Sequence, residues 1–344
     1  MRLLCLAALT FCATSAAAQP TLAPDRAPAV PSEVRPFVER LYSADANVRA
    51  EAACQLRKQH RDATAAIPIL LSMLSDDVMV PAIECHMTQW LRRQLPISAD
   101  ARKWSETSPA KEAAETLGDI GDAAVPGLLE ALRHADWRTR KFAAYGLGEA
   151  EPHFEQSKVI AALSDRLSDE HAEVRDRSAW ALGEIEEPAA VPALIRALQR
   201  DGDRQVRATA AWALGEIEDP SAVQGLVSVL NDSDLEIRRK AAWALGEIED
   251  TSAIAGLVGA LKDADVSVRK EAARALGEIE GTAAVPALVD ALKDSDWHVR
   301  KMAAWALGEI EDASALNALQ AARYDANVEV RRAVMDAIRE LRER

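Results

Sequence analysis

A ten-residue string that returns at a fixed interval constrains this chain more than any other feature. Residues 210–219 read AAWALGEIED, and the string returns at residues 241–250 and 303–312, with close variants at 178–187 and 272–280. Its glycine, which we call the marker glycine, stands at Gly183, Gly215, Gly246, Gly277 and Gly308, in steps of 32, 31, 31 and 31 residues. Such a period is typical of repeat proteins, whose units bury their apolar faces against their neighbours. We therefore expect one elongated array.

The apolar positions within one repeat predict two helices. In the first helix Val191, Leu194 and Leu198 fall on one face at helical spacing. A short turn containing aspartate follows in each unit, and its last aspartate, such as Asp234, is placed to cap the second helix. The apolar face of that second helix can only be buried against its partner and the next unit, so each repeat is predicted to be a helix pair.

The repeated motif D-x-x-V-R followed by A-A-x-A-L-G-x-I resembles the HEAT repeat, specifically the class named after phycobiliprotein (PBS) lyases, over residues 34–341. Its arginines are Arg49, Arg140, Arg175, Arg207, Arg238, Arg269, Arg300 and Arg331. The resemblance implies an all-α, right-handed α-solenoid of about nine to ten antiparallel helix pairs with the second helices on the concave side. The fixed place of the arginines and aspartates predicts hydrogen bonds between the turns of adjacent units.

A column of mostly aromatic side chains stands three residues before the marker glycines. It consists of Trp180, Trp212, Trp243 and Trp305, with Tyr145 and Arg274 at the equivalent place. At 100° per residue, Trp212 points away from the apolar face of its own helix, so we do not expect it to be buried within its own unit. With helices about 8–10 Å apart, the column forms a ladder with a rung on the order of every 10 Å.

A glutamate follows each marker glycine, beside the column on the same helix. These residues are Glu184, Glu216, Glu247, Glu278 and Glu309. Acidic groups beside exposed rings suit a basic or amphipathic protein segment, through cation–π and charge contacts. The alternative is that the rings only seal the seams between units and that the glutamates are solvated surface charges.

The two ends of the chain differ from the repeats. Residues 1–18 combine Arg2, an apolar run and small residues before Gln19, as a secretory signal peptide does, and the run is too short for a membrane anchor. Residues 19–31, rich in alanine and proline, are expected to form an extended linker. The solenoid then covers residues 32–344, with an irregular unit at 95–121 and a polar C-terminal cap at 314–344. We expect an exported protein, periplasmic or secreted.

Charge and residue inventory limit the function classes. The formal net charge is −14, and it becomes −15 once Arg2 is removed with the signal peptide, which disfavours nucleic acid and anionic lipid as partners. The resembling deoxyhypusine hydroxylases carry His-Glu pairs that hold iron, and this chain has no His-Glu dipeptide. We recognise no catalytic triad or phosphate loop, and we expect no catalytic residues, no metal and no cofactor.

Two cysteines remain after processing. Counting from Asp45 and Asp76 as helix caps places Cys54 and Cys85 at the tryptophan position of adjacent units. An exported protein permits a disulfide between them, although typical helix spacing exceeds the Cα separation of about 7 Å that a disulfide tolerates. The Cys54–Cys85 disulfide is therefore a possibility.

The leading hypothesis is an exported, non-enzymatic scaffold that binds a protein or peptide through the concave face of the solenoid, without nucleic acid and without insertion into a membrane. One alternative is an enzyme or lyase-like accessory subunit with an unrecognised site near residues 95–109 and 151–156. A convergent cluster of polar side chains beneath those segments would favour it, whereas a smooth groove would favour the scaffold. A sensor component working with a membrane protein is a third possibility.

Overall fold

The computed structural model describes residues 30–81, 106–150, 152–153 and 155–343. They belong to two compact units, one ending at Thr116 and one beginning at Leu117. The expected signal peptide, nearly all of the linker and most of the irregular stretch after residue 95 up to β2 lie outside the described residues. Among the helices that the structure describes, none combines the length and hydrophobicity needed to cross a bilayer.

The first unit contains short helices and one strand pair. Helices α1 (Arg35–Arg40) and α2 (Ala46–Arg57) are followed by a 3-10 helix η2 (His60–Ala66), α3 (Ile67–Ser72), β1 (Val80–Pro81), β2 (Glu106–Thr107) and α5 (Pro109–Ile120), which runs across the unit boundary. The strands pair antiparallel, with Val80 opposite Thr107. Helical periodicity gave no hint of this pair, because two residues are too few to show alternation.

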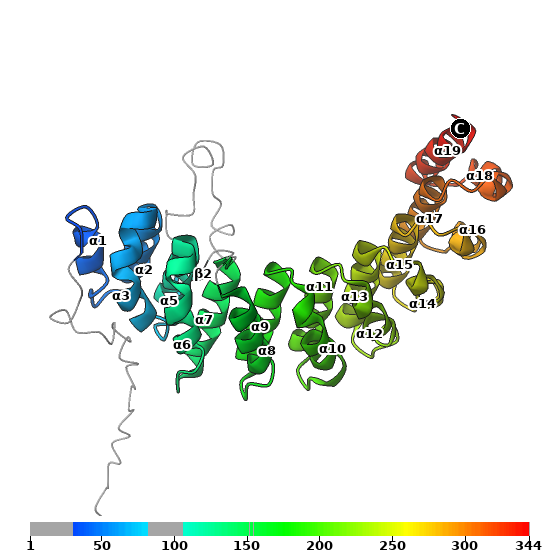
Figure 1. Cartoon of the computed structure of the whole chain (residues 1–344). Helices are drawn as coiled ribbons and strands as arrows, with labels where there is room; N and C mark the ends of the chain where they lie inside the picture. Colours follow the sequence, from blue (N-terminus) through cyan, green and yellow to red (C-terminus); the bar gives the residue numbers. More distant parts are fainter. Residues whose placement is uncertain (1–29, 82–105, 151, 154, 344) are drawn as a thin grey trace, which may run out of the picture. The chain divides into compact units, whose positions relative to one another are not determined.

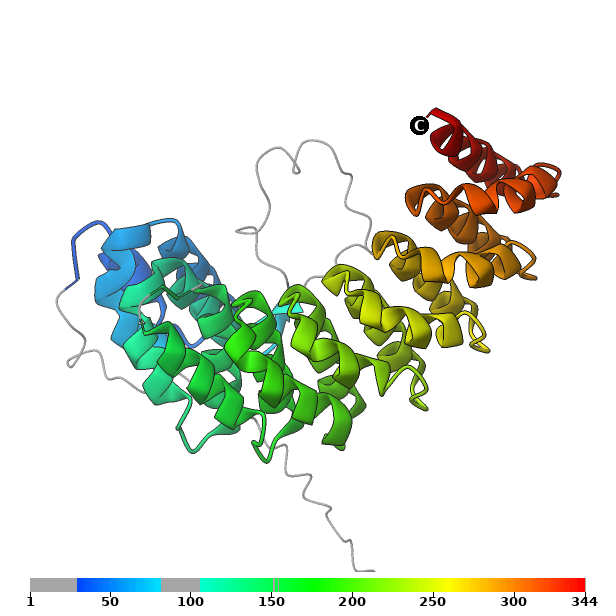
Figure 2. The same cartoon turned by 45° about the vertical axis from the view of Figure 1, so that its right-hand side comes forward.

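The second unit is a run of helix pairs (Figures 1 and 2). Its first helices are α6 (Val125–Ala131), α8 (Gln156–Arg166), α10 (Val191–Arg200), α12 (Val223–Val227), α14 (Ile254–Ala260), α16 (Val285–Ala291) and α18 (Leu316–Ala322). Its second helices are α7 (Trp137–Glu149), α9 (Ala172–Glu184), α11 (Arg204–Glu216), α13 (Leu235–Ile248), α15 (Val266–Glu278), α17 (Trp297–Glu309) and α19 (Val328–Glu343). Within this unit the second helices form the inner row of the curve and the first helices the outer row (Figure 1). The predicted all-α solenoid is confirmed.

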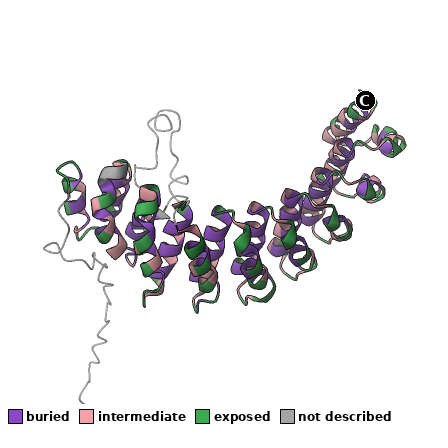
Figure 3. Cartoon of the chain, in the orientation of Figure 1, coloured by how far each residue is buried: buried purple, intermediate pink, exposed green. Residues whose placement is uncertain are grey.

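Each pair closes over the apolar stripe that the sequence predicts. Leu194 and Leu198 of α10 and Val206 and Leu214 of α11 are fully buried, and Figure 3 shows the buried residues between the two rows of helices. The predicted cap is also present, since the Asp203 carboxylate accepts hydrogen bonds from two backbone amides in the first turn of α11. Equivalent caps are formed by Asp45, Asp136, Asp234, Asp265 and Asp296.

Consecutive second helices touch at the marker glycine. A Cβ atom added to Gly215 would lie 2.6 Å from Cζ3 of Trp243 and 2.9 Å from Cβ of Ala244, both in the following unit. These separations are shorter than van der Waals contact, so the seam between α11 and α13 leaves no space for a larger residue. The glycine is therefore required by the approach of the next helix.

An arginine fork ties each turn to the turn of the next unit. Nε and Nη2 of Arg238 donate to the Asp263 carboxylate at 2.7 and 3.1 Å, and Nη1 donates to the Asp232 carbonyl at 2.8 Å. The corresponding pairs are Arg49–Asp76, Arg140–Asp169, Arg175–Asp201, Arg207–Asp232, Arg269–Asp294 and Arg300–Asp325. This confirms the predicted hydrogen bonds between adjacent turns.

The last helix pair departs from the repeat in the way the sequence indicates. Gln320 and Arg323 are exposed. Arg339 stands where other units have their marker glycine, and its Nη2 lies 2.8 Å from a carboxylate oxygen of Asp336. A long, exposed charged side chain at this position offers no small residue for a further second helix to pack against, and the polar C-terminal cap at 314–344 stays a prediction.

We predict that Gly215→Ala destabilises the protein by about 1–3 kcal/mol, because the added methyl group overpacks the seam against Trp243 and Ala244. Gly259→Ala is the matched control, since Gly259 lies in α14 with no atom within 4 Å of an added Cβ. There the better helix propensity of alanine should stabilise by up to about 1 kcal/mol. Urea unfolding of both variants tests this, and equal stability would show that the seam has room.

We predict that Arg238→Lys destabilises by about 1–2 kcal/mol, because lysine keeps the charge but cannot donate two parallel hydrogen bonds to Asp263. The neighbouring Arg239→Lys is the control. Arg239 pairs with Glu236 within one helix, and their side chains are 37% and 46% exposed, so its change should stay within about 0.5 kcal/mol. The same urea measurement applies, and equal losses would contradict a special role of the fork.

Candidate functional site

The aromatic column lies on the inner row of helices of the second unit. Tyr145, Trp180, Trp212, Trp243, Arg274 and Trp305 come one each from α7, α9, α11, α13, α15 and α17, and all are partly buried. The structure thus brings every predicted member of the column onto consecutive helices. None of the rings is fully buried or fully exposed, so both earlier interpretations have a structural counterpart.

The buried part of each indole covers the marker glycine of the preceding unit. Cζ3 of Trp180, Trp212, Trp243 and Trp305 lies 2.7, 2.9, 2.6 and 2.7 Å from the Cβ position of Gly148, Gly183, Gly215 and Gly277, respectively. One edge of each indole therefore seals a seam, as the structural interpretation predicted. The rest of the ring remains partly accessible on the inner row.

At the N-terminal end of the column the rings touch each other. The Tyr145 and Trp180 ring centroids are 5.0 Å apart, with a tilt of 37°. The Arg177 guanidinium lies 5.3 Å from both centroids, a distance at which a cation is attracted to an aromatic face. The column thus already accommodates a cation of the protein itself at one rung.

The predicted glutamates stand one helical turn after the rings. The Trp212 and Trp305 side chains hydrogen-bond to Glu216 and Glu309, respectively. Burial raises the pKa of the Glu216 carboxyl, and the charges of Glu186, Glu247 and Glu218 raise it further, against the lowering effect of the Trp212 hydrogen bond. Burial likewise raises the pKa of Glu309, and Glu340 and Glu280 add to it. The rim of the column is therefore crowded with carboxylates.

Arg274 changes the chemistry of its rung. Its guanidinium pairs with Glu271 at 2.5 Å, with Glu247 at 3.1 Å and with Glu278. Burial raises the pKa of Glu278 to about 7, the Arg274 charge opposes the rise, and Glu247 and Glu271 add to it. Oε2 of Glu278 lies 2.5 Å from the Cβ position of Gly246, so a carboxylate covers the glycine that a tryptophan covers in other units.

A cavity beside Trp305 was not anticipated from the sequence. It has a volume of about 500 Å³ and is lined by side chains of α15, α17 and α19, among them Glu278, Met302, Trp305 and Glu340. The sequence signal was the absence of a tryptophan at Asp336, which occupies the ring position in α19. Because of that absence, α19 supplies no ring to cover the groove between α17 and α19.

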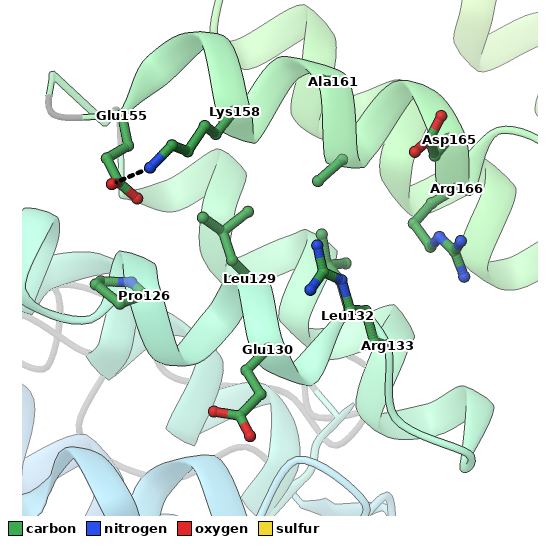
Figure 4. A pocket seen from close by; sticks show the side chains of 11 residues that line it. Pro126, Leu129, Glu130, Leu132, Arg133, Glu155, Lys158, Ala161, Asp165 and Arg166 are labelled. Atoms are coloured by element: carbon green, nitrogen blue, oxygen red, sulfur yellow. Dashed lines mark hydrogen bonds and ion pairs between the residues drawn. The ribbon is translucent and has the colours of Figure 1, made fainter.

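A second groove lies on the outer row, between α6 and α8 (Figure 4). It measures about 710 Å³, and Leu129 and Ala161 face each other across it. At one end Nζ of Lys158 lies 2.5 Å from Oε1 of Glu155. The repeat step from Gly148 to Gly183 is 35 residues, longer than the usual 31. Within this longer step, Glu155 adopts a left-handed conformation just before α8 (φ 59°).

The lengthened turn also borders a small cavity of about 260 Å³, lined by His153, Gln156, Glu184 and Glu186 among others. Nε2 of Gln156 donates a hydrogen bond to Oε1 of Glu187 at 2.8 Å. In the part of the chain that the structure describes, no group of three or more histidine, cysteine or acidic side chains is arranged to hold a metal ion. Residues 151 and 154 lie outside the described residues.

The structure shows that Asp76 is not the helix cap that the predicted register of Cys54 and Cys85 assumes. Asp76 accepts from Nε of Arg49 at 2.6 Å, so it holds the place of Asp263 in the regular units and is not a helix cap. Cys54 is buried and disulfide-bonded. Because Cys85 lies outside the described residues, the Cys54–Cys85 pairing stays a prediction.

Solved structures resemble the chain in fold. YibA of Escherichia coli is 23% identical with a TM-score of 0.52, over 69% of this chain and 88% of that chain. The complex of CpcE and CpcF of phycocyanin lyase from Nostoc is 25% identical with a TM-score of 0.42, over 63% and 94%. An engineered protein is 23% identical with a TM-score of 0.46, over 90% and 99%. At such identities the likeness to YibA shows the fold alone.

No curated protein matches the chain. Models of protein families do match it and give a more specific assignment than the solved structures. A PBS lyase HEAT-like repeat matches residues 110–134. HEAT repeats match residues 125–205, 191–271 and 254–339, which together cover more than half of the sequence. The chain therefore belongs to the HEAT-repeat family.

Proposed function

We propose that this protein is an exported, non-enzymatic scaffold that binds a basic, extended segment of a partner protein along the aromatic column. The proposal rests on how the rings of the column are held in place. Each indole is held by one edge over a glycine while the rest of the ring stays partly accessible. Rings fixed in this way are preorganised, so a ligand would lose little entropy in ordering them.

The charges beside the rings favour a basic partner. Glu216, Glu278 and Glu309 all have carboxyl pKa values raised by burial and by neighbouring carboxylates. A cation placed among them would relieve that repulsion and could also lie on the face of an indole. The acidic net charge of −14 would attract such a segment over a longer range.

The geometry favours an extended segment. Rungs on the order of 10 Å apart follow from helix packing, and an extended chain advances about 3.3 Å per residue. A segment with a basic residue at every third position would therefore place one cation at each rung. Export rests on the signal-like residues 1–18 of the sequence.

We predict that Trp212→Ala combined with Trp243→Ala weakens binding of such a segment by about tenfold or more, because two stacked cations lose their rings. The probe is a fluorescent peptide of five Ala-Ala-Arg repeats, measured by fluorescence anisotropy, with Ala-Ala-Glu repeats as the charge control. Trp297→Ala is the matched variant, since Trp297 begins α17 outside the column and stacks on His298 at 3.6 Å.

The double variant also opens two seams, so its melting temperature is measured alongside. The proposal requires the loss of affinity to exceed what the loss of stability explains, with the protein shown to be folded at the assay temperature. Unchanged affinity together with a large loss of stability would mean that the rings only seal the seams.

We also predict that affinity for the arginine probe rises about two- to threefold between pH 6 and pH 8. An acid with a pKa of about 7, as Glu278 has, is mostly neutral at pH 6 and mostly charged at pH 8, while arginine stays charged throughout. The extra negative charge on this partly exposed rung adds a modest attraction. Glu278→Gln should flatten the profile, and an unaltered rise in that variant would assign the effect to other groups.

A further inference from the structure

The cavity beside Trp305 is lined by apolar surface, by carboxylates and by a single aromatic ring. Met302 and Ala333 supply apolar surface from α17 and α19, Trp305 supplies the ring from α17, and Glu278 and Glu340 supply carboxylates. An aliphatic stem could lie on Met302 and Ala333 while a charged end lies beside the ring. The volume of about 500 Å³ is ample for one long side chain.

The cavity exists because both neighbouring rungs lack a ring. Arg274 precedes Trp305 in the column and Asp336 follows it. In the last pair Oε2 of Glu340 lies 2.5 Å from the Cβ position of Gly308, so a carboxylate again covers the marker glycine in place of an indole. The groove between α17 and α19 is thereby left open in front of Trp305.

The charges lining the cavity leave an excess of carboxylate. The Lys301 ammonium and the Arg332 guanidinium lie 3.5 and 3.4 Å from the same carboxylate, that of Glu329, and Arg274 already pairs with three glutamates. Within the described residues, Glu340 forms no ion pair. An aromatic wall next to an unmatched carboxylate is a setting that favours a cation.

We propose that this cavity is the anchor pocket of the scaffold and takes one arginine or lysine side chain of the partner segment. Its stem lies on Met302 and Ala333, and its cation lies between the Trp305 ring and the Glu340 carboxylate. The inference rests on the proposed function, since the side chain belongs to the segment that follows the column. It adds that one basic residue is held in a cavity, whereas the others lie on the partly accessible ring faces of the column.

The test uses the full-length protein labelled with ¹⁵N-tryptophan, whose Trp305 indole signal is assigned with a Trp305→Phe variant. The probe is the capped peptide Ala-Ala-Arg-Ala-Ala, and its counterpart carries citrulline, a neutral isostere of arginine. The arginine peptide should shift the Trp305 indole signal before those of Trp212 and Trp243. The citrulline peptide should leave it in place at concentrations up to about 10 mM.

Glu340→Gln should weaken the arginine peptide about three- to fivefold, the loss expected for one partly screened charge. Glu130→Gln, on the outer row and exposed, is the control and should leave the affinity unchanged. Equal shifts with citrulline, or no effect of Glu340→Gln, would overturn the cation pocket. So would a response to free agmatine at lower concentration than to the peptide, which would indicate a small-amine site.

The two proposals fail separately in this design. If the five-repeat arginine probe moves the Trp212 and Trp243 signals while Trp305 does not respond to either peptide, the anchor pocket is wrong and the column remains a binding surface. If Trp305 alone responds and the five-repeat probe binds no more tightly than the short peptide, the pocket is an isolated cation site and the inference, which places it on a partner segment, is overturned.

Discussion

The contact between consecutive second helices is the interaction on which the rest of the array depends. A second helix that is followed by another is held twice by its neighbours: an arginine fork fixes its first turn, as Arg238 does with Asp263, and its marker glycine receives a side chain of the next helix in the last turn, an indole in most units, as Gly215 receives Trp243. Two attachment points on one helix fix both its spacing and its rotation. Because only one edge of the indole is used, the rest of the ring has a defined place on the inner row.

The C-terminal ends of the second helices lack the features that would stabilise them most. At five of these ends a glutamate adopts a left-handed backbone conformation with φ between 53° and 55°: Glu186, Glu218, Glu249, Glu280 and Glu311. Glycine would adopt that conformation without strain, and a negative charge near a helix C-terminus opposes the helix dipole. These five glutamates thus cost stability, and the arginine forks and buried seams offset that cost. A basic ligand would offset the part that comes from charge, which links these acidic helix ends to the proposed function.

Features that recur with the fixed period of the repeat could be predicted from the sequence. The helix pairs, the caps such as Asp203, the arginine forks and the membership of the column all follow from residue spacing alone. The sequence did not show which glycine each ring covers, because that depends on packing between units. The cavity at Trp305 depends on what α19 lacks, and periodicity does not describe an absence. The prediction that Asp76 caps a helix was wrong for a related reason. In the regular units two aspartates two residues apart serve as fork acceptor and helix cap, whereas the residue two positions after Asp76 is Val78.

Positions that depart from the repeat make one unit different from the next, which identical units cannot do. An array of identical rungs would hold a basic segment equally well in several registers, each shifted by one unit, because every rung would present the same ring and the same glutamate. In the proposed complex, Arg274 and Asp336 would remove that degeneracy. Arg274 brings a cation to one rung, and Asp336 opens the groove beside Trp305, so a shift by one unit would place the anchoring side chain against a closed seam. A near-perfect repeat can thus select one register through two substitutions on either side of a single tryptophan.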